Sequence, residues 1–173
     1  SFFEAVNFGA FVGDPTRTKL ILDRIVNEAL RLKVKEVCIC ECGTAFRVMK
    51  QLSGKHPFTV SAITDVHARY LKEGRIRLDK TKFNVPITYH DPCQIARKGG
   101  IVKQPRNLLN MVADNFVEMP EAGKMNWCCG AGGGNYWNEE EGERINYTRA
   151  KEAFENAITV VIALGGPTYF RSQ

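Results

Sequence analysis

The apolar residues of this chain recur at two spacings, one typical of helices and the other of short buried strands. From Arg17 to Leu32 they repeat every three or four residues and leave the charged side chains on the opposite face, which predicts an amphipathic helix capped by Thr16. Four further segments show helical patterns: 46–52, 65–74, 105–116 and 138–156. Four apolar runs have the length of strands: 34–40, 58–63, 84–89 and 158–164. The alternation of the two patterns predicts an α/β fold in which helices cover both faces of a parallel sheet.

The order of helix, strand and turn repeats once along the chain. A constant offset sets Ile21 against Ile145, Val37 against Val161 and Thr44 against Thr168. Self-similarity in the same element order indicates an internal duplication. We therefore expect two pseudo-duplicated halves, residues 1–83 and residues 84–173, each with parallel strands flanked by helices.

The residues that indicate chemistry lie mainly in the second half. His90-Asp91-Pro92-Cys93 is followed, after a 34-residue gap, by Cys128-Cys129 and a glycine-rich run. Asp91 and Pro92 predict an N-cap and a first-turn proline, which would place Cys93 at a helix start that favours a thiolate. Adjacent cysteines before glycines contribute little to packing and leave the backbone free to surround a ligand, which indicates a metal cluster.

The composition of the chain narrows the classes of protein to which it can belong. The chain has 173 residues, six cysteines and no secretion signal, which favours metal or redox chemistry in a reducing compartment over disulfides. Its net charge of +5 comes from interspersed residues without a basic run, so we expect no nucleic-acid partner. No apolar run is long enough to span a bilayer, and we expect a cytoplasmic protein. The absence of an initiator Met indicates a piece of a longer polypeptide.

These motifs resemble the cysteine-rich CCG domain of heterodisulfide reductase catalytic subunits, and of their relatives in membrane-bound redox complexes of sulfate reducers and sulfur oxidisers. Asn7-Phe8-Gly9 and Glu41-Cys42-Gly43 resemble the first CCG-related half of those relatives. The resemblance implies a noncubane [4Fe-4S] cluster that passes single electrons to or from a disulfide or persulfide substrate. It implies these cluster ligands, the last of them contributed by the first half: Cys93, Cys128, Cys129 and Cys42.

The same resemblance implies partners. We expect other subunits of a redox complex, including a ferredoxin-type domain, and membrane subunits that would hold the protein at the cytoplasmic face of a membrane. A disulfide-bearing molecule is the expected substrate.

The chain departs from the family at its end. The family usually supplies a CxxC just after the last strand, whereas the segment from Leu164 to Tyr169 contains no cysteine. An iron–sulfur cluster generally takes four thiolates. Cys42 would complete the set if it faces the CCG loop, which is the loop formed by Cys128, Cys129 and the glycines after them. Alternatively, the cluster has been lost, or the sequence at this end departs from the native chain.

Other residues near the motifs have structural interpretations. Cys38 and Cys40 share one face of a predicted strand, which favours core packing. His90 is expected to orient its turn by hydrogen bonding, and Arg97 and Lys98 to be exposed helix charges. The aromatic residues that flank the CCG loop are expected to shield the cluster from water: Trp127, Tyr136 and Trp137.

Three other functions fit parts of the pattern. The same cysteines could hold zinc in a structural module that docks a redox partner. Related CCG domains also occur in the iron–sulfur subunit of lactate or glycolate oxidoreductases. The glycine run could cradle a phosphate, but the preceding segment from Lys124 to Trp127 is short and polar for the strand that such a loop requires.

Overall fold

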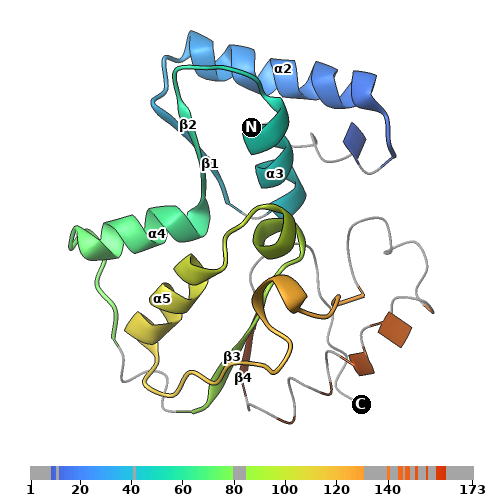
Figure 1. The fold of residues 1–173 in the computed structure, drawn as a ribbon. Helices are drawn as coiled ribbons and strands as arrows, with labels where there is room; N and C mark the ends of the chain where they lie inside the picture. The colour runs from blue at the N-terminus through green and yellow to red at the C-terminus, as the bar shows by residue number, and fades with distance from the viewer. Residues whose placement is uncertain are drawn as a thin grey trace.

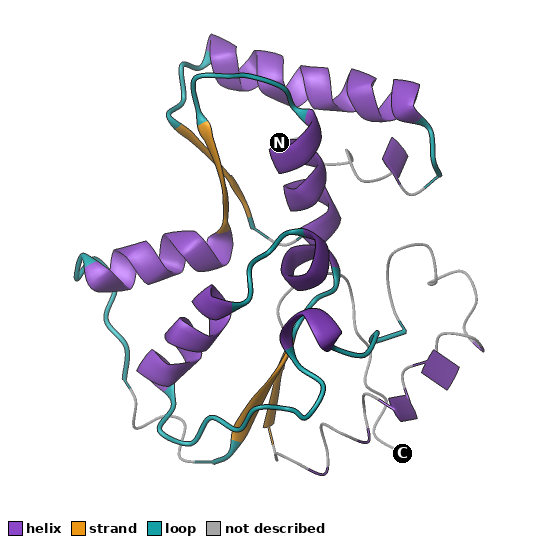
Figure 2. Ribbon diagram, viewed as in Figure 1, coloured by secondary structure: helices purple, strands orange, loops and turns teal. Residues whose placement is uncertain are grey.

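Helices surround two short pairs of parallel strands in this protein (Figure 1). The computed structural model describes residues 9–10, 12–40, 42–79, 85–130, 140, 144–145, 147–148, 151, 155 and 159–162. Figure 2 shows the elements, which follow in this order: α2 (Pro15–Arg31), β1 (Glu36–Ile39), α3 (Gly43–Leu52), β2 (Thr59–Ala62), α4 (Ile63–Lys72), β3 (Ile87–His90), η2 (Gln94–Lys98), α5 (Lys103–Val112), η3 (Gly123–Met125) and β4 (Thr159–Ile162).

The first half is built around β1 and β2. These strands pair in parallel from Glu36 beside Thr59 to Ile39 beside Ala62, and α3 forms the crossover between them. The long helix α2 supplies its apolar face to the same core. The buried members of this core are Leu22, Ala29, Ala45, Val48, Met49 and Phe58. A polar contact adds to the apolar packing, because Glu36 on β1 forms a 2.6 Å ion pair with Arg69 on α4.

The second half is built around β3, which is buried along its whole length. It pairs in parallel with β4, from Ile87 beside Thr159 to His90 beside Ile162. A one-residue parallel bridge joins Ile87 to Phe116, where Val117 N donates to Ile87 O at 2.8 Å. Backbone neighbours on both sides thus hold β3 and the turn that follows it in a fixed place.

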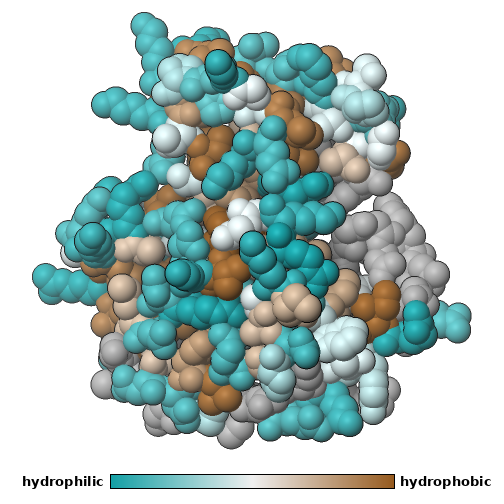
Figure 3. All heavy atoms as spheres, viewed as in Figure 1, coloured by the Kyte–Doolittle hydropathy of each residue, from teal (hydrophilic) through white to brown (hydrophobic). Residues whose placement is uncertain are grey.

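The two halves share an apolar contact. Phe46 on α3, Ala62 on β2 and Ile95 on η2 form one buried cluster with Ile101. Helices α4 and α5 also lie side by side (Figure 1). Charged and polar side chains cover much of the face shown in Figure 3, with apolar groups between them. None of the helices in the described ranges has the length and apolar character that a bilayer crossing needs.

The α/β class is confirmed, but the expectation of one sheet is wrong for the part of the chain that the structure describes. Its strands form two separate two-stranded sheets. The predicted equivalence of the two halves stays a prediction, and the helix expected over 138–156 lies largely outside the described residues.

Two helix ends differ from the predictions. Asp14, rather than Thr16, caps α2, because Pro15 occupies the first turn and the Asp14 carboxylate accepts from Arg17 N at 2.8 Å. Helix α5 ends at Val112 instead of continuing to Phe116. The residues beyond it turn away because their backbone pairs with Ile87.

Candidate metal centre

Cys42 lies at the start of α3, where the two halves meet. It is half-buried, and its Sγ accepts a hydrogen bond from Ala45 N at 3.3 Å, as a capping side chain does. Gly43 follows it without a side chain. A Cβ at Gly43 would lie 2.8 Å from Ile95 Cγ1 and 3.1 Å from Gln94 Cβ. Only glycine therefore allows the start of α3 to pack this closely against the start of η2.

Cys93 immediately precedes η2, a single turn of π-helix. The chain therefore brings the helix that follows Cys93 beside the helix that follows Cys42. The predicted capping of this turn by Asp91 is wrong. No side chain caps η2, and the Asp91 carboxylate is directed elsewhere because it is buried and needs a cationic partner.

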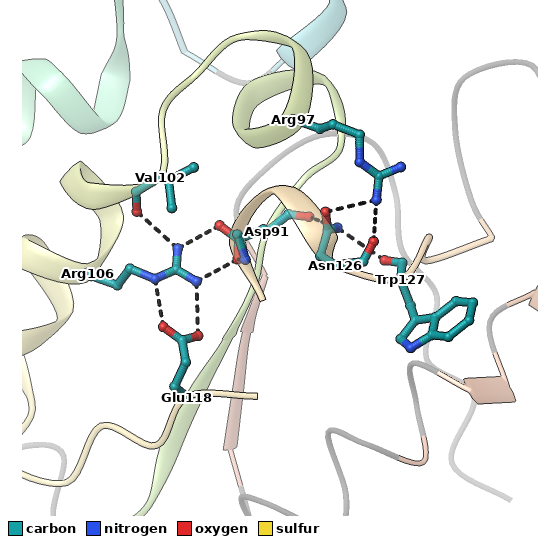
Figure 4. Close-up of polar contacts among 8 residues, drawn as sticks. Asp91, Arg97, Val102, Arg106, Glu118, Asn126 and Trp127 are labelled. Carbon is teal, nitrogen blue, oxygen red and sulfur yellow. Dashed lines mark hydrogen bonds and ion pairs between the residues drawn. The ribbon is translucent and has the colours of Figure 1, made fainter. Parts of the chain in front are cut away.

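That partner is Arg106 on α5 (Figure 4). Its two terminal nitrogens donate to the two Asp91 oxygens at 2.6 Å each, while Gly123 N donates to Asp91 Oδ2 at 2.7 Å. Arg106 Nε and Nη2 also bind Glu118, at 2.7 and 2.9 Å. The hydrogen bond with Asp91, more than that with Glu118, raises the pKa of Arg106. These contacts fix the turn before Cys93 to α5 and to η3.

A second set of contacts reaches the segment before the cysteine pair. Asn126 donates from Nδ2 to the backbone oxygen of Asp91 at 2.5 Å, and Arg97 on η2 donates to the backbone oxygens of Lys124 and Asn126 at 2.9 and 2.5 Å. Figure 4 shows Asn126 between Asp91 and Arg97. Arg97 is exposed on η2, as expected, and its guanidinium also donates to two backbone carbonyls.

Cys128 and Cys129 follow directly, the first exposed and the second half-buried. A hydrogen bond from Cys129 lowers the pKa of Cys128 to about 6, with smaller contributions from Gly130 N–H, at 3.4 Å, and from the charge of Arg97. Burial opposes this shift. The lowered pKa favours the thiolate of Cys128, which is the form that binds metals and acts as a nucleophile.

Comparison with known proteins finds a family that matches the part of the chain with the cysteine pair. Residues 87–166, which contain Cys93, Cys128 and Cys129, match the family model described as "CCG: Cysteine-rich domain". This segment belongs to the cysteine-rich CCG domain family.

The relatives confirm the expected resemblance to heterodisulfide reductases. The chain is 38% identical over 113 residues to a dihydromethanophenazine:CoB--CoM heterodisulfide reductase subunit from Methanosarcina barkeri, covering 62% of this chain and 27% of that protein. It is 33% identical over 131 residues to an EtfAB:quinone oxidoreductase from Syntrophomonas wolfei, covering 69% and 18%. An Hdr-like menaquinol oxidoreductase iron-sulfur subunit from Archaeoglobus profundus is 28% identical over 172 residues, covering 76% and 30%. The chain thus spans less than a third of each of these relatives. No solved structure matches it.

The candidate cysteines suit a thiolate-ligated metal. Cys128 has an acidic thiol next to a second cysteine, and Cys93 and Cys42 stand at neighbouring helix starts. The described residues nevertheless contain no group of three or more His, Cys, Asp or Glu side chains that could hold a metal ion. The four-cysteine ligand set therefore stays a prediction, and residues 165–169, the expected site of the missing CxxC, lie outside the described part of the chain.

The other residues that the sequence analysis considered differ in how deeply they are buried. Cys40 is exposed, so its predicted place in the core is wrong, because β1 ends at Ile39 and Cys40 lies beyond it. Cys38 is half-buried, and burial, followed by the neighbouring Cys40, raises its pKa to about 11. His90 is buried at the last position of β3. Trp127 is 50% exposed. The other two aromatic residues near the CCG loop, Tyr136 and Trp137, lie outside the described residues.

Three residues that the sequence did not single out lie around the segments that carry Cys93 and Cys128. Arg106 and Glu118 join Asp91 in one ionic network, and Asn126 links Asp91 to the cysteine pair. No sequence signal pairs an arginine with an aspartate fifteen residues earlier on a different element. Asn126 had one weak signal, since it precedes Cys128 by the same two positions that separate Asp91 from Cys93.

Proposed function

We propose that this chain is the iron–sulfur electron-transfer part of a heterodisulfide reductase-like oxidoreductase, and that it holds a noncubane [4Fe-4S] cluster. The observation that carries the proposal is the CCG match over residues 87–166, which contains Cys128, a cysteine of lowered pKa, next to Cys129. The printed names of several relatives, such as the iron-sulfur subunit from Archaeoglobus profundus, support it. The proposed ligands are Cys42, Cys93, Cys128 and Cys129.

Two of the proposed ligands, Cys128 and Cys42, have a local reason to be thiolate donors. Cys128 already carries the lowered pKa, and Cys129 donates the hydrogen bond that contributes most to it. Cys42 caps α3, so its sulfur lies at the partly positive end of a helix. A bound cluster would supply one-electron chemistry, with a potential set by hydrogen bonds and charges around its sulfurs.

The described residues indicate how the chain would support that chemistry. Gly43 lets Cys42 approach the second half, and Arg97 places a cation near Cys128. Cys128 is exposed. We propose that a disulfide or persulfide substrate approaches from the Cys128 side, where the positive charge of Arg97 would favour a thiolate leaving group.

The chain would work within a larger assembly. It spans 27% of the Methanosarcina barkeri relative and 18% of the Syntrophomonas wolfei relative, so most of such a protein lies beyond the matched region. We propose that a ferredoxin-type domain delivers or receives the electrons, and that membrane subunits hold the complex at the cytoplasmic face.

Anaerobic purification followed by metal analysis and an absorption spectrum tests this function. We expect iron and acid-labile sulfide in the protein, with a brown absorption that bleaches on reduction by dithionite. A colourless protein that contains stoichiometric zinc would instead favour the structural docking module. A protein without either metal, even after incubation with iron and sulfide, would contradict both.

A further inference from the structure

Two short chain segments that carry the cysteines of the CCG domain are joined by one side chain. Asn126 Nδ2 donates to Asp91 O at 2.5 Å, which ties the residue two positions before Cys128 to the residue two positions before Cys93. Asn126 is 2% exposed, and its Nδ2 also donates to Trp127 O at 3.1 Å. A buried amide with two backbone acceptors holds its segment in one position, because shifting it would leave a buried donor unpaired.

Arg97 holds the same segment from the other side. Its Nε donates to Lys124 O at 2.9 Å and its Nη2 to Asn126 O at 2.5 Å. Arg97 lies on η2, the turn that begins directly after Cys93. The planar guanidinium reaches both carbonyls at once, whereas a lysine amine is a single point donor.

These contacts differ from the Asp91–Arg106 network in what they join. Arg106 connects Asp91 to α5 and Glu118, and neither of these carries a cysteine; in that network the hydrogen bond of 2.7 Å from Gly123 N to Asp91 Oδ2 is the contact that reaches the segment before Cys128. Asn126 and Arg97 instead connect the Cys93 segment directly to the Cys128 segment. They act at two separate points, the backbone oxygen of Asp91 and the backbone oxygens of Lys124 and Asn126.

We propose that Asn126 and Arg97 are positioning residues that fix where Cys93 lies relative to the Cys128–Cys129 pair, and so preorganise the cluster site. We call this relative position the register of the two segments. This role deepens the proposed function and rests on it for its biological meaning. Metal sites depend on surrounding hydrogen bonds that orient their ligands, and such contacts contribute to metal affinity. In this chain the contacts act on the backbone that carries the ligands rather than on the ligands themselves.

Cross-linking in the metal-free full chain tests the register without requiring a cluster. A short bifunctional maleimide is added, and the Cys93–Cys128 product is quantified by peptide mass spectrometry. Dividing its rate by the rates of reaction with a monofunctional maleimide removes effects of thiol reactivity. We expect Asn126→Ala and Asn126→Asp to lower this ratio roughly fivefold, the effect of losing one hydrogen bond of ordinary strength.

The arginine variants separate geometry from charge. Arg97→Gln and Arg97→Lys should both lower the ratio, because neither side chain reaches both carbonyls as the guanidinium does. Asn27→Ala and Arg24→Gln on the exposed face of α2 are matched controls and should leave the ratio unchanged. Circular dichroism and thermal unfolding verify that the Asn126 variants are folded. An unchanged ratio both in Arg97→Gln and in a folded Asn126 variant would overturn the proposal. If Arg97→Lys has the same cross-linking ratio as the parent, Arg97 acts through its charge alone, and this result would also overturn its positioning role.

The iron-loaded protein gives the second measurement. We expect the Asn126 and Arg97 variants to show an altered electron paramagnetic resonance spectrum and a roughly fivefold faster loss of iron than the parent and the two controls. Identical spectra and iron loss in all variants would contradict the role at the cluster. If the parent takes up no iron, the proposed function fails, while the cross-linking result still decides whether these residues set the register.

Discussion

Arg106 binds Asp91 through two parallel hydrogen bonds of 2.6 Å, and the aspartate side chain is completely buried. Asp91 precedes Cys93 by two residues, so this ion pair fixes the turn that leads to the CCG site. Removing the arginine would leave a buried carboxylate without its cationic partner, and such a loss destabilises proteins by about 3–5 kcal/mol. We expect Arg106→Ala to lower the free energy of unfolding by this amount in urea titrations.

The ion pair between Arg69 and Glu36 provides the matched control. It has the same 2.6 Å separation, but the arginine side chain is 42% exposed, against 15% for Arg106. Solvent screens exposed pairs, so Arg69→Ala should cost much less. Equal losses of stability in the two variants would show that burial of Asp91 is not what makes Arg106 important.

The lowered pKa of Cys128 predicts a pH profile for its alkylation. In the metal-free protein, the rate of reaction with iodoacetamide at Cys128 should rise with pH and level off above an inflection near pH 6, whereas Cys38, with a pKa of about 11, should react slowly at neutral pH. Replacing Cys129 with alanine removes the largest cause of the shift and should move the inflection upward. Peptide mass spectrometry measures each site separately, and an inflection near 9 in the parent would contradict the assigned hydrogen bond.

The same shift has a consequence for stability. The pKa of Cys128 in the folded protein lies below that of an unfolded thiol, so its contribution is fully present above the unfolded value and is lost as pH falls toward 6. We expect the metal-free parent to lose more stability than Cys128→Ser between pH 9 and pH 6. Parallel curves of unfolding free energy against pH would contradict this expectation.

The close contact at Gly43 predicts a loss of fit between the halves. Gly43→Ala would place a Cβ 2.8 Å from Ile95 Cγ1, and overpacking of this kind costs about 1–3 kcal/mol. In a double-mutant cycle, Ile95→Ala should reduce the cost of Gly43→Ala, because it removes the atom that the new methyl group meets. Additive effects of the two substitutions on the free energy of unfolding would show that the contact does not limit the packing of α3 against η2.

The elements could be predicted where local pattern determines them. The apolar stripe from Arg17 to Leu32 predicts α2 almost to its ends because a helix with one buried face needs that spacing. Gly74, the last residue of the helical pattern predicted over 65–74, adopts a φ of +70° just beyond the end of α4. The predicted cap of α2 lies two residues too late because Pro15 shifts the helix start.

The surroundings of the site could not be predicted, because they depend on tertiary contacts. Asp91 has the sequence context of a helix cap, yet its burial requires the guanidinium of Arg106 from a later helix. Arg97 has the context of a surface charge, yet two carbonyls from residues 124 and 126 face it. Cysteine spacing indicated the kind of chemistry, whereas the packing of Gly43 against η2 brings the Cys42 and Cys93 helices together.

The segment after the last strand offers a test of the missing ligands. The resemblance places the final CxxC of the CCG family at residues 166 and 169, which are Gly and Tyr here, so we expect a cluster held without these two thiolates to lose iron in air. We expect the double variant Gly166→Cys/Tyr169→Cys to retain iron longer than the parent. Cysteines introduced at the exposed positions Lys19 and Asp23 serve as a control, and equal iron retention in parent and double variant would show that positions 166 and 169 are not vacated ligand positions.

The sharpest test of the proposed centre is the iron content of six single Cys→Ser variants, purified anaerobically and reconstituted side by side. We predict that Cys93→Ser, Cys128→Ser and Cys129→Ser lose the cluster and that Cys42→Ser loses it or binds it with a changed spectrum. Cys38→Ser and Cys40→Ser should retain iron at the level of the parent, because Cys38 is held as a neutral thiol and Cys40 is exposed just beyond the end of β1. Equal iron contents in all six variants, whether retained or lost, would contradict the division into ligands and non-ligands on which the proposed centre depends.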